Sequence, residues 1–468
     1  MDRLLEGLEV TETRGDPAAV EVTSVELDSR QVTPGALFVC LPGRRADGHD
    51  FAAVAVAAGA VALVVERALP VHVPQVMVPP GTARRALAQL AGTFYDHPAR
   101  ALTTVGVTGT NGKTTVTHLV ASILDAAGRP SAVVGTLQGE RTTPEAPVLQ
   151  RILDDARRRG RSAVAMEVSS HALTESRVDG IRFDAAVFTN LGHDHLDHHG
   201  TMEAYFEAKA SLFTPSRAVL GVVNGDDPWG RRLLEQRTIP LVTYSLGDAD
   251  QVETAPGRTA FRWRGRRVEL ALTGAYQVAN AVAAAATTSA LGVPDDVVAR
   301  GLARARPVPG RFEVLDADAP FTVVVDYAHT PDALAAALDS ARRLANGGRV
   351  LCVFGCGGDR DREKRPLMAQ VATAGADLTV ITSDNPRHED PMAILEEVVR
   401  GATPGAEVEV EPARSAAIAR AVGRARAGDV VLVAGKGHES VIEVGDERIP
   451  FDDRAVAATA VRDRGGGA

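Results

Sequence analysis

The sequence predicts an α/β protein of three domains, in which a small N-terminal α/β domain precedes two larger domains built on parallel sheets. Its 468 residues exceed what one hydrophobic core supports, and about 150 residues per domain suggests roughly three domains. From about residue 101 onward, β-type apolar runs alternate with helical stretches, as expected for parallel strands joined by crossover helices. A segment punctuated by Pro and Gly, residues 307–312, is a hinge candidate between two such regions.

The N-terminal domain is expected over residues 1–100. Pro, Gly and Asp separate its short strand-like runs, which are residues 20–28, 36–43, 60–66 and 73–79. The longest apolar run of the chain, residues 51–65, is shorter than the ~20 residues that span a bilayer. We interpret this run as a short helix ended by Gly59 and followed by a strand.

The central domain is expected over residues 101–309, with a phosphate loop and a parallel sheet. Its β-type runs are LTTVGVTG, SAVVGTL, SAVAMEVS, AAVFTNL and AVLGVVNG. The C-terminal domain is expected over residues 310–468 as a Rossmann-like, doubly wound sheet. Its β-type runs are TVVVDY, VLCVFG, LTVITSD, VEVEP and DVVLVAG.

Unusually polar residues follow these strands. In the central domain they include Glu167, Ser169 and Asn190, and in the C-terminal domain they form the strings DYAHTP, GCGGDRDREKR, DNPR and GKGHE. Because ligands of such sheets bind at the carboxyl ends of the strands, we expect two sheet edges to face one another across a single cleft.

A glycine-rich string, GVTGTNGKTT, lies between a β-type run and a helix-like segment. Backbone N–H groups and the helix N-terminus would bind phosphate oxygens, with Lys113 adding a charge and Thr114 a hydroxyl for Mg²⁺. Val107 occupies the first glycine position of the strict phosphate-loop pattern. The alternative is an ordinary Gly-rich turn, which leaves the Lys-Thr-Thr run unexplained.

Composition excludes several classes of function. A net charge of −9 with 24% charged residues disfavours nucleic acid as the main partner. Three cysteines, Cys40, Cys352 and Cys356, are too few for a disulfide framework and suggest buried thiols in a reducing compartment. The N-terminal residues carry charges where a signal peptide needs an apolar core, so we expect a cytoplasmic protein without a membrane segment.

Two further features each leave alternatives open. The string GHDHLDHHG, with Glu167 elsewhere, could bind Zn²⁺ or Mg²⁺ or form a solvated His-rich loop; the phosphate loop favours Mg²⁺. Lys209 lies among Tyr205, Phe206, Leu212 and Phe213, which on local sequence alone is typical of a lysine that extends from a core-facing helix to solvent.

Ten strings in order resemble the Mur ligases over residues 22–454. They are GVTGTNGKTT, TTPEAP, MEVSSHAL, TNLGHDHLDHHG, YFEAKASLF, VPGRFEV, DYAHTPDAL, FGCGGDRDREKRPLM, SDNPRHEDP and AGKGHE. The resemblance implies an ATP-dependent ligase that adds 2,6-diaminopimelate to UDP-N-acetylmuramoyl-L-alanyl-D-glutamate through an acyl phosphate, in cytoplasmic peptidoglycan synthesis. It also implies Mg²⁺, small-molecule substrates and a monomer.

The resemblance further implies roles for individual residues. The catalytic residues would be Lys113, Glu167, His195 and a carbamylated Lys209, and the metal ligands Thr114, Glu167, His195 and Lys209. ATP would contact Gly109, Thr110, Asn111, Gly112, Lys113, Thr114, Thr115, Asn280, Arg311 and Asp326; Gln277 stands where relatives carry Asn. The N-terminal domain would bind the uridine end of the UDP-sugar peptide. The contact residues would be Leu27, Ser29, Arg44, Arg45 and Ala46 in that domain and Thr142, Thr143, Ser169 and Arg177 in the central domain.

Diaminopimelate would contact Arg360, Asp384, Asn385, Arg387, Gly435 and Glu439. Unlike lysine, diaminopimelate carries a carboxylate beside its distal ammonium. Arg387 can pair with that carboxylate and would repel a lone ammonium, while Glu439 can bind the ammonium. The sequence therefore favours diaminopimelate over lysine as the added amino acid.

Two alternatives remain at this point. The first is another ATP-dependent amide ligase, such as a folylpolyglutamate synthase or a Mur-like ligase with another amino acid or a natural-product substrate; folate enzymes lack a uridine-type N-terminal domain. The second is a nucleotide-gated switch that makes no bond, for which the His and carboxylate residues around the phosphate loop would be unnecessary.

Overall fold

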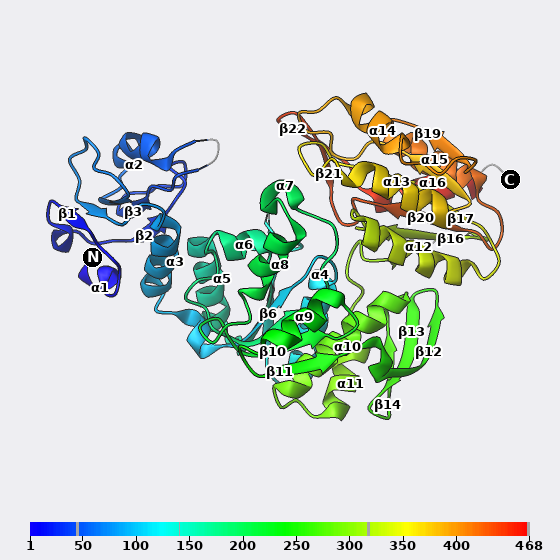
Figure 1. Cartoon of the computed structure of the whole chain (residues 1–468), viewed down its shortest axis with the longest axis horizontal. Helices are drawn as coiled ribbons and strands as arrows, with labels where there is room; N and C mark the ends of the chain where they lie inside the picture. Colours follow the sequence, from blue (N-terminus) through cyan, green and yellow to red (C-terminus); the bar gives the residue numbers. More distant parts are fainter. Residues whose placement is uncertain (44–45, 140, 316–318, 466–468) are drawn as a thin grey trace.

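The structure is a computed structural model that describes residues 1–43, 46–139, 141–315 and 319–465. Figure 1 shows an N-terminal domain that meets the central domain through its residues 83–94, and a central and a C-terminal domain that adjoin each other. This three-domain α/β architecture confirms the predicted fold class. Within the described residues, no helix is both long and apolar enough to cross a bilayer.

The N-terminal domain contains a five-stranded sheet of order β1-β5-β4-β3-β2, in which only β1 is antiparallel to its neighbour. Its strands are β1 (Glu12–Arg14), β2 (Ser24–Glu26), β3 (Ala36–Val39), β4 (Ala62–Val65) and β5 (Gln75–Met77). Its helices are α1 (Asp2–Leu5), α2 (Ala52–Ala57) and α3 (Ala83–Phe94). The predicted helix before Gly59 is α2, and Gly59 follows it with a φ of +108°.

The central domain contains a six-stranded, wholly parallel sheet of order β11-β10-β9-β6-β8-β7. The strands are β6 (Thr103–Thr108), β7 (Ser131–Val134), β8 (Ala163–Glu167), β9 (Phe183–Phe188), β10 (Ala218–Asn224) and β11 (Leu241–Tyr244). The helices are α4 (Lys113–Ala126), α5 (Ala146–Arg158), α6 (Ser170–Thr174), α7 (Leu196–His199), α8 (Met202–Ala210), α9 (Pro228–Gln236), α10 (Ala275–Ala290) and α11 (Asp295–Arg304).

Helices cover both faces of this central sheet, because successive side chains of its strands point to opposite faces. On β9, Ala185 and Val187 pack in one core cluster with α4, α10 and α11, whereas Ala186 and Phe188 pack in the other with α5 and α8. Strands β6 and β9 are neighbours, yet the chain leaves them toward opposite edges of the sheet. A crevice at their carboxyl ends is therefore the expected ligand position.

The C-terminal domain contains a second six-stranded sheet of order β15-β16-β20-β17-β18-β19, parallel except for β15. The strands are β15 (Glu313–Val314), β16 (Thr322–Asp326), β17 (Val350–Phe354), β18 (Leu378–Ile381), β19 (Val408–Val410) and β20 (Val430–Ala434). The helices are α12 (Pro331–Ala345), α13 (Lys364–Gly375), α14 (Pro391–Val399), α15 (Arg414–Arg424) and α16 (Asp453–Gly465).

Two smaller sheets were not predicted from the sequence. One is antiparallel and consists of β12 (Ala249–Ala255), β13 (Arg258–Trp263) and β14 (Arg266–Leu270). The other is the hairpin of β21 (Val441–Val444) and β22 (Glu447–Pro450). Most residues of β12 and all of β22 are exposed, so these strands lack the apolar runs by which the buried parallel strands were recognised.

Candidate active site

A cleft of about 1120 Å³ lies between the central and C-terminal domains. Its lining includes the residues that follow β6, β8 and β9 in the central sheet and those that follow β16, β17, β18 and β20 in the C-terminal sheet. The expectation that two sheet edges face one another in one cleft is therefore confirmed.

The phosphate loop joins β6 to α4 and lies on the central wall of the cleft. The half-buried Lys113 turns back on this loop, and its Nζ donates to the carbonyls of Gly109 at 2.9 Å and Thr110 at 2.8 Å. Gly112 caps α4 without a side chain. The first N–H groups of a helix lack intrahelical acceptors, so this end of α4 can bind an anion.

Gly109 is required by the close approach of β9 and its following loop. Its φ is +149°, and a Cβ at this position would lie 1.8 Å from Thr189 Oγ1. The loop is also held from that side by Asn190, whose carbonyl accepts from Thr110 N at 2.9 Å and whose Oδ1 accepts from Asn111 N at 2.9 Å. The shape of the loop thus depends on contacts with the neighbouring strand.

Glu167, at the end of β8, is buried beside the start of α4. One carboxylate oxygen accepts from Thr114 Oγ1 at 3.1 Å and from Thr136 Oγ1 at 3.2 Å, and the other accepts from Thr136 N at 2.8 Å. The structure therefore brings the predicted pair Thr114 and Glu167 into direct contact. Together they present hard oxygen ligands beside the phosphate loop.

Lys209, on α8, points inward and is only 1% exposed. Its Nζ donates to Gly109 O at 2.8 Å and lies 4.6 Å from the centre of the Tyr205 ring. Burial, with Lys113 nearby, holds the pKa of Lys209 well below its usual range. The interpretation of Lys209 as a lysine extending to solvent is therefore wrong, because its amine lies under the phosphate loop.

His195 precedes α7 with a φ of +57°, and its side chain is 38% exposed to the cleft. Nε2 lies 3.4 Å from Asp194 Oδ2, and the ring contacts His171 edge to face. Partial burial disfavours the charged imidazolium and lowers the pKa of His195. A neutral imidazole results, and this is the form that can ligate a cation.

Asn280, on α10, lies directly against the phosphate loop. A Cβ on Gly112 would come within 2.5 Å of its Oδ1, while its Nδ2 donates to Gln277 Oε1 at 3.1 Å. The fully buried Gln277 thus supports Asn280 from the preceding turn of the helix.

Arg311 and Asp326 reach the same cleft from the C-terminal side. Arg311 Nη2 donates to Thr114 Oγ1 at 2.8 Å, across the interface between the domains. Asp326 accepts from Tyr276 Oη at 3.2 Å and from Phe312 N at 2.5 Å. Burial raises the pKa of Asp326.

The opposite wall of the cleft holds the six residues expected to contact diaminopimelate, which are Arg360, Asp384, Asn385, Arg387, Gly435 and Glu439. Asn385 Nδ2 donates to Glu439 Oε2 at 2.9 Å. Arg387 Nε donates to Glu443 Oε2 at 2.9 Å, and its Nη1 donates to Gly358 O at 2.9 Å. A carboxylate of the protein therefore pairs with the Nε of the Arg387 guanidinium.

The expected UDP-sugar-peptide residues fall into two groups. Thr142, Thr143, Ser169 and Arg177 line the cleft, and Thr143 Oγ1 accepts from Ser169 N at 3.0 Å. Leu27, Ser29 and Ala46 lie in the N-terminal domain, outside the lining of this cleft. Arg44 and Arg45 lie outside the described residues.

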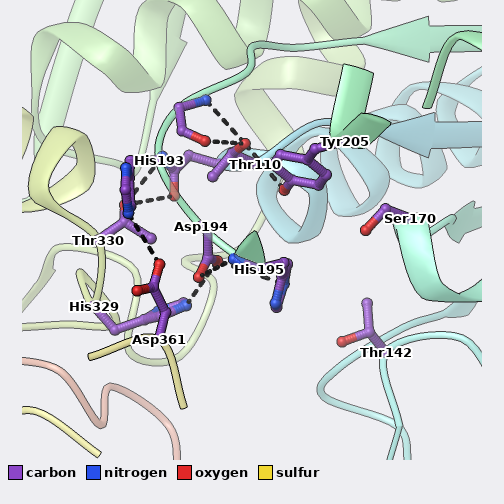
Figure 2. A network of polar contacts seen from close by, with 12 residues as sticks. Thr110, Thr142, Ser170, His193, Asp194, His195, Tyr205, His329, Thr330 and Asp361 are labelled. Atoms are coloured by element: carbon purple, nitrogen blue, oxygen red, sulfur yellow. Dashed lines mark hydrogen bonds and ion pairs between the residues drawn. The ribbon is translucent and has the colours of Figure 1, made fainter. Parts of the chain in front are cut away.

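Sequence reasoning missed three buried charged residues that organise the site. Asp194 lies 3.4 Å from Lys364 Nζ on the C-terminal domain and 3.8 Å from His329 Nε2, as Figure 2 shows for Asp194 and His329. Lys436 is fully buried and donates to both Asn385 Oδ1 and Glu439 Oε2 at 2.9 Å. These residues lie in the strings GHDHLD, DREKR and GKGHE. The contacts of Asp194 depend on how the two domains meet, and those of Lys436 depend on how the loops after β18 and β20 meet.

Each of the three domains matches a model of the same protein family. Family models match residues 21–104 (Mur ligase family, catalytic domain), 107–288 (Mur ligase middle domain) and 310–437 (Mur ligase, glutamate ligase domain). A curated relative from Geobacillus thermodenitrificans, a UDP-N-acetylmuramoyl-L-alanyl-D-glutamate–2,6-diaminopimelate ligase, is 47% identical over 95% of this chain and 96% of its own.

Two solved structures have the same fold. A UDP-N-acetylmuramoyl-L-alanyl-D-glutamate–2,6-diaminopimelate ligase is 34% identical, with a TM-score of 0.64 over 95% of each chain. MurF ligase from Thermotoga maritima in complex with ADP is 22% identical, with a TM-score of 0.66 over 96% of this chain and 98% of its own.

A Gly109→Ala variant tests the phosphate loop. Because the added Cβ would collide with Thr189 Oγ1, we expect ATP affinity to fall by roughly tenfold or more, equivalent to about 1.4 kcal/mol, in isothermal titration calorimetry. Gly128→Ala is the matched control: Gly128 also has a positive φ, but a Cβ there would meet nothing within 4 Å. Equal ATP affinity in the two variants would contradict this role of Gly109.

Proposed function

This chain belongs to the Mur ligase family, and from this membership we infer that it is an ATP-dependent, ADP-forming ligase. It adds 2,6-diaminopimelate to UDP-N-acetylmuramoyl-L-alanyl-D-glutamate in peptidoglycan precursor synthesis. The observation that carries this conclusion is near full-length similarity to ligases of this activity, combined with a cleft shared by the phosphate loop and the DNPR residues.

We propose that ATP binds along the central wall of the cleft, across the domain interface. Lys113 and the N-terminus of α4 would hold the terminal phosphates, and Arg311 would add a second cation from the C-terminal domain. The nucleotide residues would be Gly109, Thr110, Asn111, Gly112, Lys113, Thr114, Thr115, Asn280, Arg311 and Asp326. Lys113 Nζ, now bonded to loop carbonyls, is free to exchange these acceptors for phosphate oxygens.

We propose that Mg²⁺ accompanies the nucleotide. Thr114 and Glu167 fit such an ion, because both are buried and their oxygens lie 3.1 Å apart beside the phosphate loop. His195 and a carbamylated Lys209 would hold a second ion near the reacting carboxylate. When bound, Mg²⁺ offsets the negative charge that the phosphates and the carboxylate bring together.

Carbamylation would remove the repulsion between the buried amine of Lys209 and that of Lys113. Its amine and that of Lys113 donate to the same carbonyl of Gly109, and two ammonium ions so close would repel each other. The lowered pKa of Lys209 favours the neutral amine, which can add CO₂ with loss of a proton. The product is a carbamate whose oxygens carry negative charge beside Lys113.

The reaction then proceeds in two steps on the residues of the cleft. A glutamyl carboxylate oxygen attacks the γ-phosphorus of ATP, so that an O–P bond forms, the bond to the β-phosphate oxygen breaks and ADP leaves. The amine of diaminopimelate attacks the carbonyl carbon of this acyl phosphate, a C–N bond forms, and phosphate and a proton depart. Lys113 and Arg311 stabilise charge in the first step, and the C-terminal wall positions the amine for the second.

We propose that the C-terminal wall selects diaminopimelate. Arg387 would pair with its distal carboxylate and Glu439 with its distal ammonium, while Arg360, Asp384, Asn385 and Gly435 complete the pocket. Arg387 Nε donates to Glu443 Oε2 at 2.9 Å, and this contact would orient the guanidinium for the substrate carboxylate.

We propose that the UDP-sugar peptide extends from the cleft toward the N-terminal domain. Thr142, Thr143, Ser169 and Arg177 would bind the part near the reacting carboxylate, and Leu27, Ser29, Arg44, Arg45 and Ala46 the uridine end. We also place the domain boundaries near residues 100 and 309, and the enzyme in the cytoplasm as a monomer. The buried free thiols Cys40, Cys352 and Cys356 are compatible with a reducing compartment.

An Arg387→Ala variant tests the amino-acid pocket. The lost charge-assisted contact is worth about 1.5–3 kcal/mol, so kcat/KM for diaminopimelate should fall roughly 10- to 100-fold, while weak activity with L-lysine should not fall. Phosphate release from ATP, measured with the muramoyl dipeptide and a panel of amines, reads out both values.

The matched control for this test is Arg362→Ala, since Arg362 is also an arginine of the C-terminal domain but is 63% exposed, pairs with Glu397 and does not line the cleft. Its amine preference should equal that of the unaltered enzyme. If the unaltered enzyme uses L-lysine as well as diaminopimelate, or if Arg387→Ala keeps the original preference, the pocket assignment is wrong.

Carbamylation of Lys209 is tested by ¹³C NMR after exchange with ¹³C-bicarbonate. We expect a protein-bound carbamate signal that is absent from Lys209→Arg and retained in Lys436→Arg, because Lys436 is equally buried but keeps two acidic or amide acceptors. Activity should fall in CO₂-free buffer and return with bicarbonate. Full activity without CO₂, with no signal, would rule out the modification.

A further inference from the structure

A second cluster of metal-ligand side chains lies across the domain interface, apart from the groups assigned to nucleotide and substrates. His193 comes from the loop after β9, whereas Asp361 and Glu363 come from the segment between β17 and α13. One ligand atom from each lies within 4.8 Å of the other two. Figure 2 shows the His193 ring directed at the Asp361 carboxylate.

Two buried atoms of this cluster lack a hydrogen bond among the described residues. His193 Nε2 and Asp361 Oδ2 lie 3.0 Å apart, at the distance of an ion pair if the imidazole is protonated, yet neither has a hydrogen-bond partner with suitable geometry. The other Asp361 oxygen accepts from Glu363 N at 2.9 Å, and Asp361 as a whole is only 6% exposed. A buried carboxylate oxygen left in this state is costly, and a cation between the two atoms would satisfy both.

The ligand set identifies the class of cation. Imidazole nitrogen combined with carboxylate oxygen is typical of Zn²⁺. Mg²⁺ favours sites such as the one proposed at His195 and Lys209, where substrate phosphates supply further oxygen ligands. His193, Asp361 and Glu363 do not line that cleft. Zinc bonds of about 2.0–2.2 Å in a tetrahedron separate neighbouring ligands by roughly 3.3 Å, which is close to the observed separation of Nε2 and Oδ2. Three protein ligands would leave the fourth position to water.

We propose that His193, Asp361 and Glu363 form a Zn²⁺ site that links the C-terminal domain to the central domain. The ligands come from both domains, so the complete site exists only when the cleft has the arrangement seen here. A cation that binds this arrangement more tightly than an open one shifts the population toward it. This site is next to another contact between the two domains, in which Lys364 Nζ lies 3.4 Å from Asp194 Oδ1.

Zn²⁺ binding to the full-length protein tests the site. Equilibrium dialysis would be done without nucleotide and with excess Mg²⁺, so that oxygen-ligand sites are filled. We expect one tightly bound equivalent of Zn²⁺, and a loss of affinity of roughly 100-fold or more in His193→Ala and in Asp361→Asn, with a smaller loss in Glu363→Gln. Circular dichroism of each variant establishes that it is folded.

Three control variants locate the ion. His388→Asn removes an exposed histidine that also contacts a carboxylate, Asp359, at 2.7 Å, and should leave Zn²⁺ affinity unchanged. Glu167→Gln alters the proposed Mg²⁺ ligands, and Cys356→Ser removes a thiol that lines the cleft; both should also retain Zn²⁺. Loss of the ion in Glu167→Gln or Cys356→Ser, but not in His193→Ala, would overturn the proposal.

Domain closure supplies an independent readout. With fluorophores on the outer faces of the central and C-terminal domains, Zn²⁺ should increase energy transfer in the unaltered protein and leave it unchanged in His193→Ala. The proposed Zn²⁺ site would be contradicted if the unaltered protein bound no Zn²⁺, or if His193→Ala and Asp361→Asn bound it as tightly as the unaltered protein. Either result would leave the ligase assignment intact.

Discussion

A small number of polar contacts joins the carboxyl edges of the two large parallel sheets, and the function of this chain depends on that junction. Arg311 donates to Thr114 at 2.8 Å, Asn111 to Thr330 at 3.4 Å and Lys364 to Asp194 at 3.4 Å, and His193 lies 3.0 Å from Asp361. Without them the phosphate loop and the amino-acid pocket would lie on separate bodies. Because the contacts are polar and few, the interface can open to admit substrates and close for chemistry.

Charge balance explains why so many buried polar groups gather at this junction. Lys113 and Lys209 share one carbonyl acceptor beneath the phosphate loop, and the buried carboxylate of Asp194 lies between the domains. A nucleotide bound as proposed would add negative charge on the side of Lys113, where the protein offers cations and N–H donors. The site is thus organised for anions that would otherwise repel each other.

Sequence reasoning predicted the parts of the fold that are buried on both faces. Every residue of β17 is buried, and such strands appear as uninterrupted apolar runs, whereas the exposed β22 carries no such signal. The strand-end rule placed Glu167 and Asn385 at the cleft, and family resemblance supplied their expected roles. The contact of Glu443 with Arg387 and of Asp194 with Lys364 could not be predicted, because each joins segments whose meeting depends on the hairpin or on the domain arrangement.

The proposed ligase reaction requires the cleft to bring a carboxylate into bonding contact with the terminal phosphate of ATP. The most direct measurement uses muramoyl dipeptide labelled with ¹⁸O in its reacting glutamyl carboxylate, followed by mass spectrometry of the released inorganic phosphate. An acyl phosphate requires one labelled oxygen to pass from each carboxylate to phosphate. Release of unlabelled phosphate during amide formation would contradict this account.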